Sequence, residues 1–388
     1  MKPIVIIGSG HAGLTLAREI RVLDGASPVV LISREDICAY YKPNLSKALT
    51  MRKSPEDLVM KSETQLQEQL QITLMSRCTV VAVNAGDQIV SVQDDQGMQQ
   101  DLSYRALVMA TGANPVRVPI QTTGPVPIHT LNNLDDFRAY HRDLQGKKRV
   151  LVIGAGFVGA EVASDLISHG IQVDVVDKGL WPLQRVLPET LGSAIQNAMA
   201  KTGVTWHMGR VVESIEAGES EYRVKLSDGS IILTEMILSA VGLRANTQLA
   251  NSAGINVGQG YIVDRVSQTS VKGIYALGDC AQYEGSIVPF IAPATLAAKA
   301  LAKTLTGSPA ALNFPALPVP VKLSACPTVI CPSLVGNGVW EVQGAGTDLE
   351  AHLLDEHGQI IGFALTGTSV ARKNALMQKC QTTLELVA

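Results

Sequence analysis

The chain is poor in aromatic residues and has no long uninterrupted apolar run. Its 388 residues include only 3 Trp, 8 Tyr and 5 Phe, too few for the stacking platforms that bind single-stranded nucleic acid. The formal net charge of -3 and the pI of about 6.2 also argue against a general nucleic-acid-binding surface. The long uncharged stretch 323–340 is interrupted by prolines and glycines. Because a membrane span needs about 20 predominantly apolar residues, none is expected.

Cysteine is scarce as well. The chain has 6 cysteines, too few for a disulfide scaffold. No export signal is recognisable near Met1, so a cytoplasmic location is expected. The 46% of hydrophobic residues and the mean hydropathy of +0.18 predict a large core. At about 150 residues per domain, the length predicts two or three domains. The sequence leaves the oligomeric state open and favours a monomer.

A strand–turn–helix pattern occurs twice. The apolar run 4–7 leads into the glycine-rich turn 8–13, and the run 150–153 leads into the turn 154–159. In such turns the first glycine allows a tight bend, the second lets the backbone approach a pyrophosphate, and the third lets the helix pack on the strand. The next helix presents free N–H groups to the phosphate. The two copies predict two nucleotide-binding domains of common ancestry. The predicted loop residues are Gly8, Ser9, Gly10, His11, Ala12 and Gly13 in the first copy, and Gly154, Gly156, Phe157, Val158 and Gly159 in the second.

An acidic residue near the end of the second strand of each unit is expected to bind the adenosine ribose. In the second unit this residue is Asp177, whose carboxylate would repel the extra phosphate of NADP, so NADH is the predicted cofactor. Lys178 beside it weakens that preference. In the first unit the strand ends at 33–36, where two acids are present, and Glu35 is the predicted ligand.

The C-terminal region is predicted to be a small α+β module. A proline-rich stretch, 309–320, separates it from a predicted helix at 294–305. The module is expected to contain a hairpin formed by 349–354 and 360–365, with a helix after it at 370–380.

Several segments together resemble the two-dinucleotide flavoprotein reductases. In that family a strand like 274–279 delivers an aspartate, here Asp279, to the ribityl chain of the flavin. Turns like Thr111-Gly112 and Val241-Gly242 resemble the crossovers between the FAD and NAD domains of the family. The resemblance covers at least residues 4–305 and implies a tightly bound FAD and an exchangeable NADH.

The same resemblance implies the fold. We expect an α/β chain with two Rossmann-like dinucleotide-binding domains and a small C-terminal α+β domain. The FAD domain should be discontinuous, formed by residues 1–116 and 245–318, with the NAD domain 117–244 inserted into it. A C-terminal α+β interface domain is expected at 319–388.

The cysteine pattern bears on the electron acceptor. Disulfide reductases of this superfamily carry a cysteine pair beside the flavin, spaced C-x4-C soon after the first loop or C-x2-C in the NAD domain. Here Cys38 and Cys78 are far apart in sequence, and no C-x2-C occurs. The reduced flavin is therefore expected to pass its electrons directly to an external acceptor.

The segment 40–47 and the tail motif 320–327 resemble the reductases of small iron carriers, the rubredoxin reductases most of all. This resemblance implies that NADH donates a hydride to flavin N5 and that electrons then leave singly to rubredoxin iron. Alkane hydroxylation and an oxygen-stress pathway are the expected settings. Flavorubredoxin in nitric-oxide detoxification and a 2Fe–2S ferredoxin stay open as acceptors, and so does a non-catalytic FAD-binding regulatory protein.

By the same resemblance, Lys42 and Glu161 are the predicted catalytic residues beside the flavin ring, and Lys322 reaches the ring from the C-terminal module. A lysine there would stabilise negative charge on the reduced ring, and a nearby glutamate would hold that lysine in position. The other residues predicted to bind cofactor outside the two loops are Ser33, Arg34, Glu35, Val80, Ala110, Thr111, Gly112, Asp177, Gly242, Gly278, Asp279 and Ile291.

A basic segment lies next to the proposed flavin residues. Between residues 36 and 56 the chain carries Lys42, Lys47, Arg52 and Lys53 and no acid. Because the resemblance implies a small acidic rubredoxin as partner, these four residues are predicted to form its docking patch.

The tail contains a spacing loosely similar to a zinc finger, Cys326-x4-Cys331 and then His352-x4-His357. The interval between the two pairs exceeds the usual finger loop. We therefore predict no metal site, and expect the cysteines to pack within a strand pair and the histidines to lie near a hairpin tip.

Asp177 generates a test of cofactor choice. NADH should support faster turnover than NADPH, and Asp177→Ala should narrow the difference, because the substitution removes the carboxylate that repels the 2′-phosphate. Steady-state rates with each cofactor measure the effect in both proteins. An unchanged ratio of the two rates in Asp177→Ala would contradict the assignment.

Overall fold

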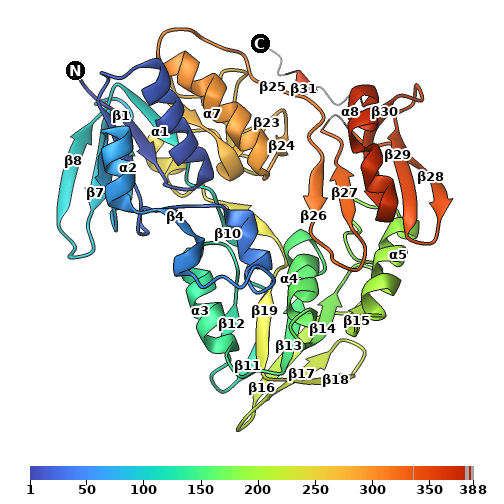
Figure 1. Ribbon diagram of the computed structural model, residues 1–388. Helices are drawn as coiled ribbons and strands as arrows, with labels where there is room; N and C mark the ends of the chain where they lie inside the picture. Colours follow the sequence, from blue (N-terminus) through green and yellow to red (C-terminus); the bar gives the residue numbers. More distant parts are fainter. Residues whose placement is uncertain (335, 381–383, 386–388) are drawn as a thin grey trace.

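The computed structural model describes residues 1–334, 336–380 and 384–385, and its three largest sheets have five strands each (Figure 1). The first is parallel, with strand order β22-β9-β1-β2-β5. Its strands are β1 (Ile4–Ile7), β2 (Val29–Ile32), β5 (Thr73–Met75), β9 (Ala106–Met109) and β22 (Ile274–Ala276). Strand β22 is separated from the other four strands by more than 160 residues of sequence, so this sheet is built from two distant parts of the chain.

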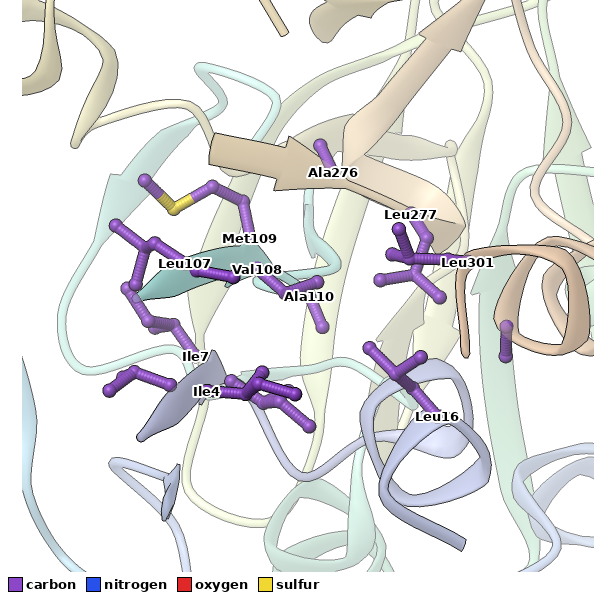
Figure 2. Close-up of a cluster of buried hydrophobic side chains, with 14 of the residues drawn as sticks. Ile4, Ile7, Leu16, Leu107, Val108, Met109, Ala110, Ala276, Leu277 and Leu301 are labelled. Carbon is purple, nitrogen blue, oxygen red and sulfur yellow. The ribbon is translucent and has the colours of Figure 1, made fainter. Parts of the chain in front are cut away.

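The centre of the first sheet is fully buried. Every residue of β1 and β9 is buried, as expected for parallel strands covered on both faces. Helices α1 (His11–Leu23) and α7 (Ile291–Leu305) pack side by side on the sheet (Figure 1). In the core, Leu16 of α1 faces Leu277 and Leu301 (Figure 2). The remaining helices of this half are α2 (Glu63–Leu70) and the short α6 (Ala250–Ala253).

Smaller elements surround the first sheet. Antiparallel strands β6 (Thr79–Asn84), β7 (Ile89–Gln93) and β8 (Gln99–Ser103) form one small sheet, and β21 (Tyr261–Val263), β23 (Ala281–Tyr283) and β24 (Ser286–Ile287) form another. The remaining short elements are β3 (Ala39–Tyr40), β4 (Val59–Lys61) and the 3₁₀ helices η1 (Lys42–Lys47), η2 (Glu56–Leu58) and η3 (Gly278–Cys280).

The second sheet repeats the first in the middle of the chain, again parallel, with order β12-β19-β13-β14-β15. Its elements are β12 (Ile128–His129), β13 (Arg149–Ile153), β14 (Gln172–Asp177), β15 (Val204–Met208), β19 (Met236–Ser239), α3 (Leu134–Leu144), α4 (Phe157–Ile167) and α5 (Glu189–Ala200). An adjoining sheet contains β11 (Gln121–Thr123), β16 (Val212–Ala217), β17 (Tyr222–Leu226) and β18 (Ile231–Thr234). The two-stranded ribbon β10 (Ala113–Pro115) with β20 (Leu243–Ala245) connects the two halves of the molecule, which are the part around the first parallel sheet and the part around the second.

The C-terminal module is a five-stranded antiparallel sheet with order β26-β27-β30-β29-β28. Its strands are β26 (Val319–Val321), β27 (Thr328–Cys331), β28 (Val339–Ala345), β29 (Asp348–Leu354) and β30 (Ile360–Thr366), and β25 (Asn313–Phe314) pairs with β31 (Leu384–Glu385) outside it. Together with the two parallel sheets, this confirms the predicted α/β fold with a C-terminal α+β module. The exact domain boundaries stay a prediction.

The predicted tail elements need two corrections. The hairpin of 349–354 with 360–365 is confirmed, but the expected helix at 370–380 begins as the 3₁₀ helix η4 (Gly367–Arg372), and α8 covers only Lys373–Lys379. His352 lies within β29 opposite Phe363, not near the hairpin tip. Among the described residues, no helix is long and apolar enough to cross a membrane.

Candidate functional site

The first glycine-rich loop is shaped by two very close approaches of backbone to backbone. Gly8 comes directly after β1 with φ +116°, and a Cβ on it would lie 2.1 Å from the carbonyl oxygen of Ala110. A Cβ on Gly13 would lie 2.0 Å from the carbonyl oxygen of Gly8. A Cβ on Gly10, in contrast, would meet nothing within 4 Å. The first and third glycines are therefore required by packing, whereas the space in front of Gly10 is open to a ligand.

The second loop repeats this geometry. Gly154 has φ +108°, and its added Cβ would lie 2.5 Å from the carbonyl oxygen of Ala240. A Cβ on Gly159 would lie 1.9 Å from the carbonyl oxygen of Gly154, while one on Gly156 would meet nothing within 4 Å. Both helices begin without a side-chain cap at Gly10 and Gly156, so their first N–H groups face the open cradle. Each cradle fits a pyrophosphate at a helix N-terminus.

Asp177 at the end of β14 holds the second loop. One carboxylate oxygen accepts a hydrogen bond from the N–H of Ala155 at 2.7 Å, and the other accepts from the N–H of Gly179 at 2.6 Å. The carboxylate thus joins the loop to the turn after β14. Its negative charge lies beside the cradle, where the ribose-binding acid was predicted.

Most residues predicted for the first site lie at the carboxyl ends of the parallel strands. The Ser9 hydroxyl donates to Ser33 Oγ at 2.9 Å, which links the loop after β1 to the end of β2. Arg34 donates to Asn114 Oδ1 at 2.9 Å, and Glu35 accepts from the amide of Asn133 at 2.8 Å. Parallel sheets bind ligands at this edge.

The side chain of His11 connects the first loop to α7. Its Nε2 lies 2.8 Å from Thr295 Oγ1, and that hydroxyl donates to the carbonyl oxygen of Ile291. Because the hydroxyl hydrogen is used there, His11 Nε2 must be the donor. Burial lowers the pKa of His11; Arg18 lowers it further, and Asp279 acts in the opposite direction. The predicted residues His11, Asp279 and Ile291 are therefore assembled around one loop.

Both loops contact the start of α7, the first through His11 and Thr295 and the second through Phe157. Phe157, the first residue of α4, packs edge-to-face on Phe290, which immediately precedes α7, with ring centroids 5.7 Å apart. The crossover ribbon is fixed by Asn246, whose amide donates to the carbonyl oxygen of Thr111 at 2.9 Å and whose own carbonyl accepts from the Thr111 hydroxyl at 2.7 Å. Gly112 and Gly242 in the two turns have positive φ. Ligands held by the two loops would therefore meet between the two halves of the chain.

Glu161 is the centre of a buried polar cluster, 7% exposed. Its carboxylate accepts hydrogen bonds from the backbone N–H and the ammonium of Lys322, both at 3.0 Å, and a very short one from the hydroxyl of Ser46. Lys322 also donates to the carbonyl oxygen of Pro43. The predicted residues Glu161 and Lys322 are brought together, and Ser46, which was not predicted, lies between them.

The structure distinguishes the predicted lysines by their partners. Glu161 forms its ion pair with Lys322, whereas Lys42 donates to Asn132 Oδ1 at 2.8 Å. The prediction that Lys47 belongs to the docking patch is wrong. Lys47, assigned to the docking patch, is only 9% exposed and donates weakly to Ser324 Oγ at 3.4 Å. It is too deeply buried to contact a partner protein.

For three other predicted residues the structure gives burial or backbone geometry. Val80 is buried in the core that underlies the first sheet. Gly278 has φ +74°, and its added Cβ would lie 2.9 Å from the Cβ of Ala12. Val158 is 39% exposed in the second loop. Asn132, Asn246 and Asp165 belong to the same region but were missed, since single polar residues outside a motif give no sequence signal.

The thiols do not resemble a redox relay. Burial raises the pKa of Cys38, Cys78, Cys280 and Cys326, whereas a relay cysteine needs its thiolate stabilised. Cys280 is fully buried and donates to the carbonyl oxygens of Met109 and Leu277. No disulfide involves these four cysteines, and the described part of the chain holds no cluster of three or more metal-ligating side chains.

Comparison with known proteins gives two family matches. Residues 2–300 match the family described as "Pyridine nucleotide-disulphide oxidoreductase", and residues 311–380 match "Rubredoxin binding C-terminal domain". A protein of Acinetobacter baylyi named "Rubredoxin-NAD(+) reductase" is 36% identical over 384 residues, covering 98% of each chain. A "Nitric oxide reductase FlRd-NAD(+) reductase" of Aeromonas salmonicida is 33% identical over 380 residues, covering 97% of this chain and 96% of that protein.

Solved structures agree in fold. A ferredoxin reductase from Rhodopseudomonas palustris is 26% identical, with a TM-score of 0.87, covering 99% of this chain and 96% of that one. A water-forming NADH oxidase from Lactobacillus brevis is 20% identical, with a TM-score of 0.89, covering 98% and 91%. At that identity the second likeness shows the fold alone.

The glycines generate a contrast between folding and binding. Gly13→Ala and Gly159→Ala should destabilise the protein by about 1–3 kcal/mol or more, because the new methyl group overlaps a carbonyl oxygen. Gly10→Ala and Gly156→Ala should change stability by less than about 1 kcal/mol, yet weaken binding because the methyl group enters the open cradle. Chemical unfolding measures the first effect; bound FAD for Gly10→Ala and KM for NADH for Gly156→Ala measure the second.

Gly13 and Gly159 lie inside helices, where helix propensity favours alanine over glycine, so a loss of stability at these two positions reports the steric overlap. The cradle geometry would be contradicted if the Gly10 and Gly156 variants lost as much stability as the Gly13 and Gly159 variants and ligand binding stayed unchanged.

Proposed function

The chain belongs to the pyridine nucleotide-disulphide oxidoreductase family and is an oxidoreductase, and on this premise we propose that it is an NADH-dependent FAD protein that reduces rubredoxin. FAD is assigned to the loop 8–13 and NADH to the loop 154–159. The observation that carries the proposal is the presence of two open cradles that both contact the start of α7, through His11 and through Phe157. Two dinucleotides held in this way would place their reactive ends together.

Bound FAD would supply the chemistry that converts one hydride from NADH into two single electrons. The protein contributes binding and orientation. The uncapped N–H groups of α1 and α4 would hold the pyrophosphates, and Asp279 is assigned to the ribityl chain. Lys42, Lys322 and Glu161 are assigned to the flavin ring, where two ammonium groups and one carboxylate leave a net positive charge that favours the reduced ring.

The proposed acceptor follows from the C-terminal module. Residues 311–380 match a rubredoxin-binding domain, and this region delivers Lys322 to the Glu161 cluster. A bound carrier would then lie near the flavin. The raised thiol pKa values support direct transfer from flavin to carrier. The relatives named as nitric oxide reductase FlRd-NAD(+) reductases favour flavorubredoxin as the second candidate acceptor.

The proposed docking patch keeps three of the four predicted residues. Arg52 is exposed and Lys53 and Lys42 are half-buried, whereas Lys47 is excluded by its burial. These three residues would attract an acidic carrier. We also propose that the protein acts in the cytoplasm as a monomer, in keeping with its sparse cysteines.

Side-by-side reduction assays test the acceptor. The FAD-loaded protein with NADH should reduce rubredoxin at least about tenfold faster than flavorubredoxin or a 2Fe–2S ferredoxin at equal concentration, a difference of about 1.4 kcal/mol in activation free energy. Absorbance of each carrier measures the rate. Faster reduction of flavorubredoxin would favour the second candidate, and an FAD-loaded protein that NADH does not bleach would contradict the function.

Lys42→Ala should slow the bleaching of bound flavin by NADH roughly tenfold, because a hydrogen bond or charge contact to a charged group contributes about 1.5–3 kcal/mol. Stopped-flow absorbance measures the rate. Lys2→Ala removes an exposed lysine whose ammonium donates to Gln88 and serves as control. An unchanged rate in Lys42→Ala would remove Lys42 from the flavin site.

Charge neutralisation of the docking patch should alter encounter with the carrier alone. In Arg52→Ala with Lys53→Ala, rubredoxin reduction should slow severalfold at low salt and lose most of its salt dependence. Reduction of a small neutral acceptor should stay unchanged in rate. A rubredoxin rate that falls with salt as steeply as in the wild type would contradict the patch.

A further inference from the structure

The segment that carries Lys42 is attached to α4 at two successive helical turns. Glu161 and Asp165 are four residues apart and therefore share one face of the helix. Glu161 accepts from Ser46, in η1, and Asp165 accepts from the turn immediately after η1. Asp165 is only 3% exposed, although it belongs to neither glycine-rich loop.

Asp165 takes three hydrogen bonds from two consecutive residues. One carboxylate oxygen accepts from the N–H of Leu49 at 3.1 Å, and the other accepts from the N–H and the hydroxyl of Thr50, at 2.9 and 2.5 Å. A buried carboxylate without such donors would be very unfavourable. The position of the turn 48–50 on α4 is therefore strongly defined.

Lys47 provides a buried positive charge at the same junction. Burial lowers the pKa of its ammonium, while the carboxylates of Asp165 and Glu161 raise it and Lys322 lowers it. The ammonium reaches Ser324 Oγ, and the N–H of Ser324 donates to Ser164 Oγ at 3.1 Å. The segment 42–50, α4 and the C-terminal module thus meet at one buried charge cluster.

We propose that Asp165 is a positioning residue that fixes the segment 42–50 on α4. The inference rests on the proposed function, because its consequence concerns the flavin. Helix α4 starts at the cradle of the loop 154–159, and the other end of the segment holds Lys42 and Pro43. Asp165 would therefore fix the register between the NADH cradle and the lysines assigned to the flavin ring, without touching either cofactor.

Asp165→Asn is the first test. The amide keeps one oxygen acceptor but loses the charge and the second acceptor. We expect bound FAD per chain to be unchanged, KM for NADH to stay within twofold, and bleaching of the flavin by NADH to slow about tenfold. The visible circular dichroism of the oxidised flavin should also change, because the charges around the ring move. That spectrum is recorded without NADH.

Asp24→Asn is the matched control. Asp24 also caps a turn, accepting from the N–H groups of Ala26 and Ser27 at 2.9 Å, but lies at the far end of α1 from the loop 8–13. It should lose stability without a change in bleaching rate or flavin spectrum. If Asp165→Asn fails to fold, Thr50→Val removes one donor only and should give a two- to threefold slowing with an intact fold.

The outcomes separate the two proposals. The positioning role would be overturned if both test variants, Asp165→Asn and Thr50→Val, had the same bleaching rate and flavin spectrum as the control Asp24→Asn. A wild-type protein that binds FAD but is not bleached by NADH would overturn the proposed function, and the flavin spectra of the variants would still decide the role of Asp165.

Discussion

Helix α4 is buried along almost its whole length, so each polar group on it must find a partner inside the protein. Glu161, Ser164 and Asp165 are matched by donors from η1, the turn after it and the start of the C-terminal sheet. These contacts bring together three regions that are far apart in sequence. The same helix carries the second glycine-rich loop at its N-terminus. Satisfying its buried carboxylates therefore also sets the position of the second cradle, to which NADH is assigned, relative to the rest of the proposed site.

The two dinucleotide sites are related by the repeated loop and oriented by the contacts between the halves. Each loop alone is a generic anion site, because its glycines only create close packing and an open cradle. The edge-to-face pair of Phe157 and Phe290 and the bonds of Asn246 to Thr111 fix the two parts of the chain that carry the cradles relative to each other. Hydride transfer needs this mutual geometry more than it needs any single acid or base.

The C-terminal module is proposed both to bind the electron carrier and to contribute a residue to the flavin site. Its sheet belongs to the region that matches a rubredoxin-binding domain, and its first turn supplies Lys322 to the Glu161 cluster. A carrier bound to this module would be close to the assigned flavin residues. Because burial raises the thiol pKa values of Cys38 and Cys280, the direct path from flavin to carrier has no competitor among these cysteines.

The sequence by itself determined the features that depend on local patterns. Apolar runs and glycine spacing predicted both strand–loop–helix units and the hairpin of the tail, because strand burial and tight turns depend on neighbouring residues. It could not predict that Glu161 would pair with Lys322, that Lys47 would be buried, or that Asp165 would hold the turn after η1. Those contacts join residues more than a hundred positions apart. Only the packing of α4 between the other parts decided them, since a charge must be matched by whichever donors the fold brings to it.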